Sequence, residues 1–446
     1  MRIMLLVFWI FCAASAGAHA DEIQPSDSVV TGVVIRAAPT TSSDRLGLLR
    51  PEETLLFVSD RPGWNEVSLR DGRTGFVSKR WTIRIESEEP GEDPFPITEA
   101  APAMFAHFVY VGQGAGAILE FPCGVAVIDT GGQYTGDPDG GESFNTYLDG
   151  FFAAHPQYQN TIDVLFTSHP HLDHLAGLGG LLVNGALRYR VRNVVDNGQS
   201  GSGDSVRRQM NYRVISRARG AGFNGVSVTS ALIPNGVTNP VIDPIPRIDP
   251  EYPIRCEGQG VDPTFRVFWG GWERDTVREL GGRGRYHSKP NNHSLVIRID
   301  YGEASFLFTG DLETPAIEDM LTLYQDHLSN FDVDVYHVGH HGADNATTAP
   351  FLAAMSPQMA IISMGDLVDT TSASAPGHGH PRVAALRLLQ NAVSGARIAP
   401  VTEQAFETEH DLVDVRIDRA IYATGWQHDI VLRADARGDF SFDHVH

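Results

Sequence analysis

The chain has 446 residues and the composition of an ordinary globular protein, with 42% hydrophobic and 20% charged residues. Its length favours two domains, each able to bury a hydrophobic core. The formal net charge of −21 at pH 7 excludes a protein that coats nucleic acid through its overall charge, although a local basic groove remains compatible with it.

The first twenty residues have the pattern of a secretory signal. Arg2 gives a short positive start, an apolar stretch covers 4–14, and Ala18-His19-Ala20 offers a small-x-small cleavage site. The apolar stretch is too short to span a bilayer comfortably and lacks basic residues on its far side. We therefore predict a cleaved signal peptide over 1–20, a secreted or periplasmic protein, and no transmembrane span in the mature chain.

Short β-rich runs separated by turns follow between residues 28 and 81, and this spacing predicts a small all-β barrel. Three segments resemble the bacterial SH3-like domain in order and spacing: Val34-Ile35-Arg36-Ala37-Ala38-Pro39, Gly63-Trp64-Asn65-Glu66-Val67 and Asp71-Gly72-Arg73-Thr74-Gly75-Phe76-Val77. The resemblance implies such a domain over 27–83 and binding to a cell-wall component; a spacer without a ligand is the alternative. The acidic, Pro-rich stretch 84–103 predicts an extended linker.

Strands and helices alternate from residue 104 to about 440, which predicts an α/β fold with two sheets between helices. We expect a short helix over 175–183 and a closing β-hairpin formed by 420–423 and 429–433. A helix over 205–221 would carry five arginines on one face, either as a solvated surface or as a contact for a phosphodiester backbone. The Pro- and Gly-rich segment 222–290 predicts loops. Cys123 and Cys256 form either one disulfide or two buried free thiols.

One loop gathers three histidines and a carboxylate directly after a predicted buried strand. The apolar run 162–167 precedes Ser168-His169-Pro170-His171-Leu172-Asp173-His174. Imidazole and carboxylate are preferred ligands of zinc, and a catalytic zinc site needs several of them with one position left open. Since alternate residues of an extended loop point the same way, His169 and His171 would bind one ion. Asp173 and His174 could bind a second.

Further histidines and an aspartate follow later strands, at the strand-to-loop junctions where α/β proteins assemble their sites. These are His293 in Asn291-Asn292-His293-Ser294, Asp311 in Thr309-Gly310-Asp311, His340 and His341 in Gly339-His340-His341-Gly342, and His378 and His380 in Gly377-His378-Gly379-His380-Pro381. We predict that this set joins the histidine loop around metal, except that His378 is expected to be a loop residue and His380 is the preferred candidate of the two. Asp129 is expected to hydrogen-bond the loop instead of binding metal, and His337 is expected in the core.

These residues resemble the metallo-β-lactamase superfamily, through His169-x-His171-x-Asp173-His174 and the Thr309-Gly310-Asp311 turn. Within it, the chain is most similar to the extracellular hydrolase domain of DNA-internalisation competence proteins, through Val111-Gly112-Gln113-Gly114, Ile128-Asp129-Thr130-Gly131-Gly132, Asn291-x-x-Ser294-Leu295-Val296, Val338-Gly339-His340-His341-Gly342 and Gly379-His380-Pro381. The resemblance implies an αββα sandwich over 104–440 with the metal site at the edge between its sheets. The chain departs from that pattern at Ala115-Gly116, where an acidic residue is usual, and at His293, where many of those domains lack a histidine.

The resemblance also implies a centre of two zinc ions, for which manganese or iron could substitute. His169, His171 and His293 would hold one ion, Asp173, His174 and His380 would hold the other, and Asp311 would bridge them. Metal-bound hydroxide would attack a phosphorus or carbonyl centre. The expected catalytic residues are Asp173, His340 and His341. Of the two neighbouring histidines, His340 is preferred as the acid for the leaving group, and either could replace His380 as a ligand.

The leading functional prediction is a secreted, metal-dependent hydrolase that cleaves phosphodiester bonds in nucleic acid or an envelope polymer. A lactone, ester or amide hydrolase using the same site is the second, because one site type serves many substrates. A non-catalytic envelope-binding protein is the third, and the complete set of candidate ligands argues against it.

Overall fold

The computed structural model describes residues 22–445 except 27–28, 30–31, 41–42, 52, 62, 70–72, 86–101, 133–139, 184–185, 200–202, 204–223, 228–253, 257–259, 272–288 and 369–373. The chain divides into two compact units, Met1–Glu92 and Asp93–His446. The predicted signal peptide, most of the predicted linker, the predicted arginine-bearing helix and most of 222–290 lie outside the described residues. Among the helices that are described, none has the length and apolarity needed to cross a bilayer.

The first unit is an antiparallel β-structure, as predicted. Its strands lie in the order β3-β2-β6-β5-β4-β1-β7. Alternating residues such as Val33, Ile35, Val67 and Val77 point inward and form its core. The unit extends beyond the predicted range 27–83, because β1 pairs with both β4 and β7. The elements are β1 (Glu22–Pro25), β2 (Val33–Arg36), β3 (Arg45–Leu49), β4 (Leu55–Arg61), β5 (Trp64–Ser68), β6 (Thr74–Ser78), a 3-10 turn (Lys79–Trp81) and β7 (Thr82–Ile85).

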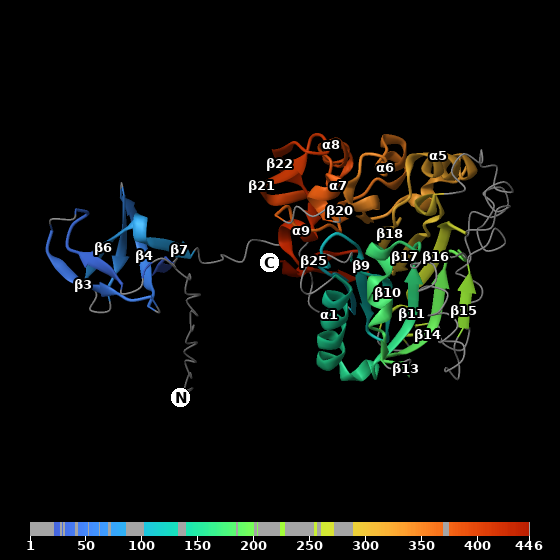
Figure 1. The fold of residues 1–446 in the computed structure, drawn as a ribbon, viewed down its shortest axis with the longest axis horizontal. Coiled ribbons are helices and arrows are strands. Elements are labelled where there is room, and N and C mark those ends of the chain that lie inside the picture. Colours follow the sequence, from blue (N-terminus) through green and yellow to red (C-terminus); the bar gives the residue numbers. More distant parts are fainter. Residues whose placement is uncertain are drawn as a thin grey trace, which may run out of the picture. The chain divides into compact units, whose positions relative to one another are not determined.

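The second unit begins with a sheet in the order β15-β14-β11-β10-β9-β8-β24-β25. Its strands are β8 (Ala103–Phe108), β9 (Gly116–Phe121), β10 (Gly124–Thr130), β11 (Thr161–Thr167), β14 (Arg190–Asp196), β15 (Asn224–Ser227), β24 (Ile430–Asp435) and β25 (Phe440–Val445). Both β10 and β11 are buried along their whole length, which suits parallel strands covered on both faces. Helix α1 (Gly140–Ala154) packs Phe144 and Leu148 against the outer face of this sheet (Figure 1).

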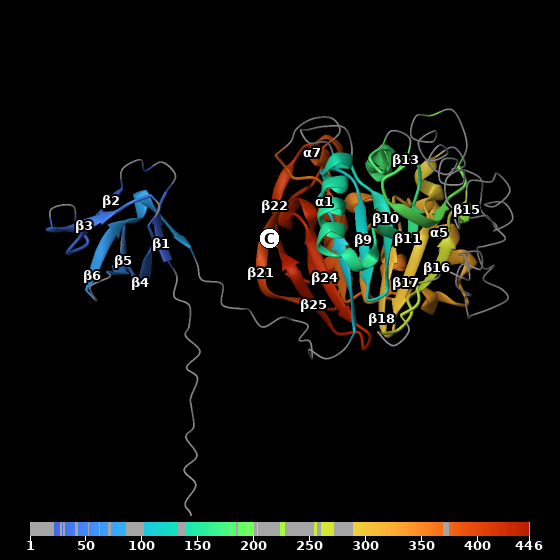
Figure 2. The ribbon, with the colours of Figure 1, turned by 90° about the horizontal axis from the view of Figure 1, so that it is seen from below.

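A second sheet, in the order β16-β17-β18-β19-β20-β23, completes the sandwich (Figure 2). Phe108 of the first sheet stacks on Phe308 and His337 of the second, with ring centroids 6.0 and 5.4 Å away. His337 therefore lies in the core, as predicted. The predicted αββα architecture is confirmed. The strands are β16 (Thr264–Trp269), β17 (Val296–Tyr301), β18 (Ala304–Phe308), β19 (Val335–His337), β20 (Met359–Ile362) and β23 (Ile421–Ala423); the helices beside them are α5 (Thr314–Leu323), α6 (Ala349–Met355), α7 (Ala375–His378), α8 (Val383–Ala392) and α9 (Thr424–Gln427).

Two local predictions were wrong. The expected helix over 175–183 is instead α2 (Leu172–Leu175), a 3-10 turn (Ala176–Gly179) and β12 (Leu182–Val183), which pairs with β13 (Ala186–Leu187). Gly177 lies so close to the Thr130 carbonyl that a Cβ there would come within 2.3 Å of its oxygen, and the glycine-rich segment is a poor helix former. The expected closing hairpin does not form, because β23 pairs with β20 in the second sheet and β24 pairs with β8 in the first. The described hairpins of this region are β21 (Ala396–Phe406) with β22 (Leu412–Arg419), and β24 with β25.

Cys123 and Cys256 form a disulfide. Cys123 lies in the turn between β9 and β10, and Cys256 lies 133 residues further along the chain. The backbone N–H of Cys256 donates to Asp262 Oδ1 at 2.6 Å. The disulfide therefore ties the segment before β16 to the first sheet. The sequence left open either a disulfide or two buried free thiols, and the structure contains the disulfide.

Candidate metal centre

The histidine loop leaves the carboxyl end of β11, where the parallel strand β10 also ends. His169 and His171 lie in the extended part of the loop, and Asp173 and His174 lie on the single turn of α2. His169, Asp173 and His174 are buried, while His171 is half-buried. The end of β11 therefore places four potential ligands within six residues.

Asp129, the next-to-last residue of β10, holds this loop in place. Its Oδ1 accepts a hydrogen bond from the Ser168 backbone N–H at 2.7 Å, and its Oδ2 lies 2.7 Å from both Ser168 Oγ and His174 Nδ1. Because a carboxylate only accepts, His174 Nδ1 carries the proton and its Nε2 is left to bind metal. The predicted role of Asp129, a hydrogen bond to the loop, is confirmed.

Asp311 reaches the same point from the second sheet. It follows β18 through Gly310, whose φ of 51° lies in the left-handed region and whose absent side chain leaves room for Ser168. The Asp311 backbone N–H donates to Ser294 Oγ at 3.1 Å. The Asp311 carboxylate lies with Oδ1 3.0 Å from His174 Nε2 and Oδ2 3.8 Å from His169 Nε2. A carboxylate in this place can bridge two ions.

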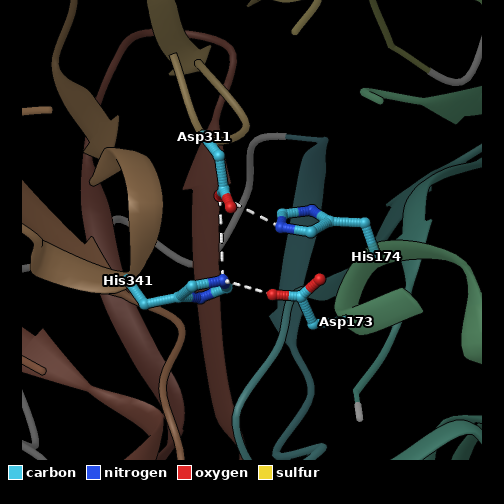
Figure 3. Close-up of side chains that lie close together, drawn as sticks. All are labelled: Asp173, His174, Asp311 and His341. Carbon is cyan, nitrogen blue, oxygen red and sulfur yellow. Dashed lines mark hydrogen bonds and ion pairs between the residues drawn. The ribbon is translucent and has the colours of Figure 1, made fainter. Parts of the chain in front are cut away.

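His341 approaches Asp311 from the turn after β19 (Figure 3). Its Nε2 lies 3.3 Å from Asp173 Oδ2 and 3.7 Å from Asp311 Oδ1. Its Nδ1 is 2.8 Å from the Ser363 carbonyl oxygen, which can only accept. Nδ1 therefore carries the proton in the neutral ring, and the Nε2 lone pair faces two carboxylates. Burial lowers the pKa of His341, but Asp311 and Asp173 raise it above its ordinary value, so either a second proton on Nε2 or a cation between the three groups offsets the carboxylate charge.

Among the residues that the structure describes, two groups of side chains have ligand atoms that all lie within 4.8 Å of one another. The first comprises Asp173, His174, Asp311 and His341, and the second comprises His169, His171 and Asp311. Within them, Nε2 of His169, Nε2 of His174 and Oδ1 of Asp311 are buried and form no hydrogen bond of regular geometry, although the last two face each other as an ion pair at 3.0 Å. Buried polar atoms normally have hydrogen-bond partners. Imidazole nitrogens and a carboxylate oxygen that converge here without regular hydrogen bonds are therefore suited to bind metal. The residues present therefore fit a centre for two ions that share Asp311.

Two residues expected as ligands lie outside both groups. His293 is buried in the turn Pro290–His293, with Nδ1 2.7 Å from the Gly271 carbonyl oxygen. His380 follows α7, with Nδ1 3.3 Å from Gln113 Nε2. The structure thus brings His341, in place of His380, to Asp173 and His174. Metal ligation by His293 stays a prediction.

His340 differs from its neighbour His341 although both have left-handed backbone, with φ of 50° and 54°. The centroids of the two rings are 6.2 Å apart and the ring planes are inclined by 63°. His340 is about one-fifth exposed, with Nε2 3.8 Å from Asp311 Oδ2 and Nδ1 3.1 Å from Asn345 Oδ1. It therefore lies beside the ligand groups and is open to the cavity above them.

Burial and charge set the protonation of the centre. Burial alone would raise the pKa of the Asp311 carboxyl, but the charges of His174, His340 and His341 hold that pKa well below its ordinary value. Burial, reinforced by His174 and His171, lowers the pKa of His169 well below its ordinary value. At neutral pH the carboxylate is ionised and the His169 imidazole is neutral, which are the forms that bind metal.

A cavity of about 420 Å³ opens over the two groups. Two lining residues, Gln113 and Asn291, belong to the motifs of the resemblance, but the sequence indicated no role for them at the site. Gln113 stands out in the sequence only as an amide residue in a glycine-rich loop after a strand. The direction of its side chain depends on the backbone of Gly365, which is distant in the sequence. The lining residues are Gln113, His171, Leu172, Asp173, Asn291, Asp311, His340, His341, His378 and His380.

Glu313 supports the turn that carries His293, a role that no sequence motif indicated. Its Oε1 accepts from Asn291 Nδ2 at 3.2 Å, and its Oε2 accepts from Asn292 Nδ2 and Lys289 Nζ, both at 3.3 Å. The carboxylate is nearly buried and precedes α5 directly. It therefore fixes the turn through three contacts from consecutive parts of the chain.

The sandwich and its ligand-bearing loops define a metallo-hydrolase fold, and family comparisons agree. Residues 118–366 match the model of the metallo-β-lactamase superfamily, and residues 31–82 match that of the bacterial SH3 domain. Since the first match covers more than half of the chain, the protein belongs to the metallo-β-lactamase superfamily.

Several known proteins are similar to parts of the chain. "ComE operon protein 3" of Bacillus subtilis is 34% identical over 100 residues, which are 22% of this chain and 11% of that protein. "Competence protein ComA" of Neisseria gonorrhoeae is 32% identical over 125 residues, 28% of this chain and 18% of that protein. The aligned segment thus spans less than a fifth of either relative. A crystal structure of the metallo-β-lactamase fold protein YhfI from Bacillus subtilis matches with 13% identity and a TM-score of 0.31, covering 66% of this chain and 94% of that one.

Proposed function

We propose that the protein is an exported hydrolase that uses two zinc ions to cleave phosphodiester bonds. The observation that carries the proposal is the pair of buried ligand groups that share Asp311 at the base of a cavity of about 420 Å³. When bound, the ions would lower the pKa of water and withdraw charge from a phosphoryl oxygen. The histidine-rich wall of the cavity suits an anionic substrate, because imidazole N–H groups can donate to phosphoryl oxygens.

The ligand residues form two sets, one for each ion, and Asp311 belongs to both. His169, His171 and Asp311 would hold one ion, with His293 as a further ligand, and Asp173, His174, His341 and Asp311 would hold the other. Asp129 and the Ser363 carbonyl orient His174 and His341 through their Nδ1 protons. These contacts would keep the ligand nitrogens in place during turnover.

His340 is the proposed acid for the leaving group. Its Nε2 lies beside Asp311 and its side chain is partly exposed in the cavity, while Nδ1 contacts the Asn345 side chain. His341 cannot serve this purpose in the same way, because its Nε2 faces two carboxylates and would be used for ligation. With Nδ1–H donating to Asn345 Oδ1, the imidazolium form of His340 carries a second proton at Nε2, and that proton could reach a departing oxygen.

Export and an envelope role form part of the proposal. The Cys123–Cys256 disulfide suits an oxidising compartment and so supports export. In the first unit, Leu56 of β4 and Ile83 and Ile85 of β7 are exposed, and the strand register through β1 places Leu56 and Ile85 on one face. We propose this apolar face as the surface that binds a cell-wall component.

A substrate panel with metal quantified tests the enzymatic proposal. The full chain, loaded with zinc, would be assayed on bis(p-nitrophenyl) phosphate, DNA, RNA and a lactone, alongside Asp173→Ala and the matched control Asp163→Asn, whose buried carboxylate lies away from the centre. We expect phosphodiester hydrolysis by the wild type and the control, and a loss of at least about 100-fold in Asp173→Ala. Hydrolysis of the lactone alone would replace the phosphodiester proposal with the second function, and absence of bound metal would favour the non-catalytic one.

A further inference from the structure

Gln113 and His380 form a hydrogen-bonded pair in the cavity wall whose direction is fixed by the backbone. Gln113 is buried, its Oε1 accepts from the Gly365 backbone N–H at 3.2 Å, and its Nε2 lies 3.3 Å from His380 Nδ1. A backbone N–H can only donate, so the amide oxygen must face Gly365. The Gln113 NH₂ group therefore faces His380.

The amide sets the tautomer of His380. An NH₂ group only donates, so His380 Nδ1 must accept, and in the neutral ring the proton lies on Nε2. His341 has the opposite arrangement, because a carbonyl oxygen at 2.8 Å requires the proton on its Nδ1. The two ring planes are inclined by 29° with centroids 6.3 Å apart, yet one ring presents a lone pair to the carboxylates and the other carries an N–H. His380 is thus built as a donor and His341 as a ligand.

We propose that Gln113 is a positioning residue that keeps His380 in its Nε2–H form, and that His380 donates this hydrogen bond to a phosphoryl oxygen of an anionic substrate. The inference rests on the proposed function and gives the cavity a specific anion-binding group. His380 lines the same cavity as Asp173, Asp311 and His340. A phosphoryl group bound in this cavity above the ligand groups would therefore lie close to His380. The hydrogen bond involves no proton transfer, and the same nitrogen is not available to a metal ion.

Substitutions at both positions separate this role from a structural one. His380→Ala should lower kcat/KM for a phosphodiester by about 100-fold, the usual effect of removing one donor to a developing oxyanion. His380→Gln, whose amide nitrogen can occupy nearly the place of Nε2, should recover most of that loss. Gln113→Glu, assayed at a pH where His380 is neutral, should act like His380→Ala, because a carboxylate accepts from Nδ1 and moves the proton of the neutral ring away from Nε2. All three variants should keep the metal content of the wild type.

The closing experiment reads the tautomer directly. In the zinc-loaded full chain with ¹⁵N-labelled histidine, the His380 signals are identified by their loss in His380→Gln, and inorganic phosphate is titrated as the probe. We expect a protonated Nε2 in the wild type, a protonated Nδ1 in Gln113→Glu, and phosphate binding at least about tenfold weaker in His380→Ala. A protonated Nδ1 in the wild type, loss of a metal ion in His380→Ala, or unchanged phosphate affinity would overturn the inference.

These measurements do not depend on turnover. If the expected tautomers and phosphate binding are found while no phosphodiester is hydrolysed, the roles of Gln113 and His380 stand and the proposed function falls. If phosphodiesters are hydrolysed but Gln113→Glu leaves the His380 tautomer unchanged, the proposed function stands and the inference falls.

Discussion

Substitution of Asp129 by asparagine should weaken metal binding without removing any ligand. The asparagine oxygen can still accept from the Ser168 backbone N–H, but its NH₂ group would then face His174 Nδ1, where the carboxylate oxygen lies 2.7 Å away in the wild type. Because NH₂ only donates, His174 would have to move its proton to Nε2, the atom 3.0 Å from Asp311 Oδ1. The nitrogen needed for ligation would be blocked.

The expected loss is about 10- to 100-fold in metal affinity, which is the usual effect of removing the partner of a ligating histidine. At 1.36 kcal/mol per tenfold change, this corresponds to about 1.4–2.7 kcal/mol. Competition between the metal-free protein and a chromogenic zinc chelator would measure it. The loss should fall on the ion held by Asp173, His174 and His341, so a titration that resolves two binding steps should show one step displaced.

Asp163→Asn provides a matched control. Asp163 lies on the neighbouring parallel strand, β11, and is also buried; its Oδ2 accepts from the Val125 N–H at 2.9 Å and its Oδ1 pairs with Arg192 Nη1 at 2.6 Å. Its replacement should lower the melting temperature while leaving zinc affinity unchanged. Wild-type zinc affinity in Asp129→Asn, or an equal loss in the control, would refute the argument that the Asp129 carboxylate sets the His174 tautomer.

Three further outcomes are expected. His341→Ala should lose about one zinc ion per chain by metal analysis, whereas His340→Ala should keep both ions and lower kcat by about 10²- to 10⁴-fold, as expected for loss of an acid; retention of both ions in His341→Ala would contradict the ligand assignment. Replacing Cys123 and Cys256 by serine should lower the free energy of unfolding by at most about 5 kcal/mol in urea denaturation, from the entropy of a loop of 133 residues, and no change would mean that the disulfide leaves the unfolded state unconstrained. Burial lowers the pKa of His174, but Asp311 and Asp129 raise it well above its ordinary value. In the metal-free protein, the contribution of His174 to stability should therefore be complete below about pH 6.5 and decline as the pH rises through the higher folded pKa. A melting temperature of the metal-free protein that does not change with pH over that range would argue against this prediction.

The sequence predicted the fold well where the signals are local. A buried run followed by His169-x-His171-x-Asp173-His174 places ligands after a strand, and the structure has that arrangement. The all-β character of the first unit likewise follows from alternating short runs. Local patterns failed where the choice of partner is distant. The β23 and β24 segments have similar apolar character, and only the packing of two separate sheets decides that they do not pair with each other.

The distinction between His341 and His380 was beyond the sequence for the same reason. Both follow strands of the second sheet, and both stand next to glycine or proline in short polar turns. What separates them is the group behind Nδ1, a carbonyl at Ser363 in one case and an amide at Gln113 in the other. Gln113 lies 267 residues from His380 in the chain, and its own orientation depends on a third segment at Gly365. No spacing rule contains that information.

The same physical rule sorts four histidines of the centre; His340, whose Nδ1 also faces an acceptor oxygen, can donate from Nε2 only as the imidazolium. An acceptor behind Nδ1 forces the proton onto that nitrogen and directs a lone pair forward, and this is found for His174 with Asp129, His341 with Ser363 and His293 with Gly271. A donor behind Nδ1 has the reverse effect, and His380 has one. The surrounding backbone and second layer of side chains thus determine which imidazoles can bind metal and which can contact substrate. By this rule His293, although it lies outside both compact groups, is prepared as a ligand, whereas His380, although it lines the cavity, is not.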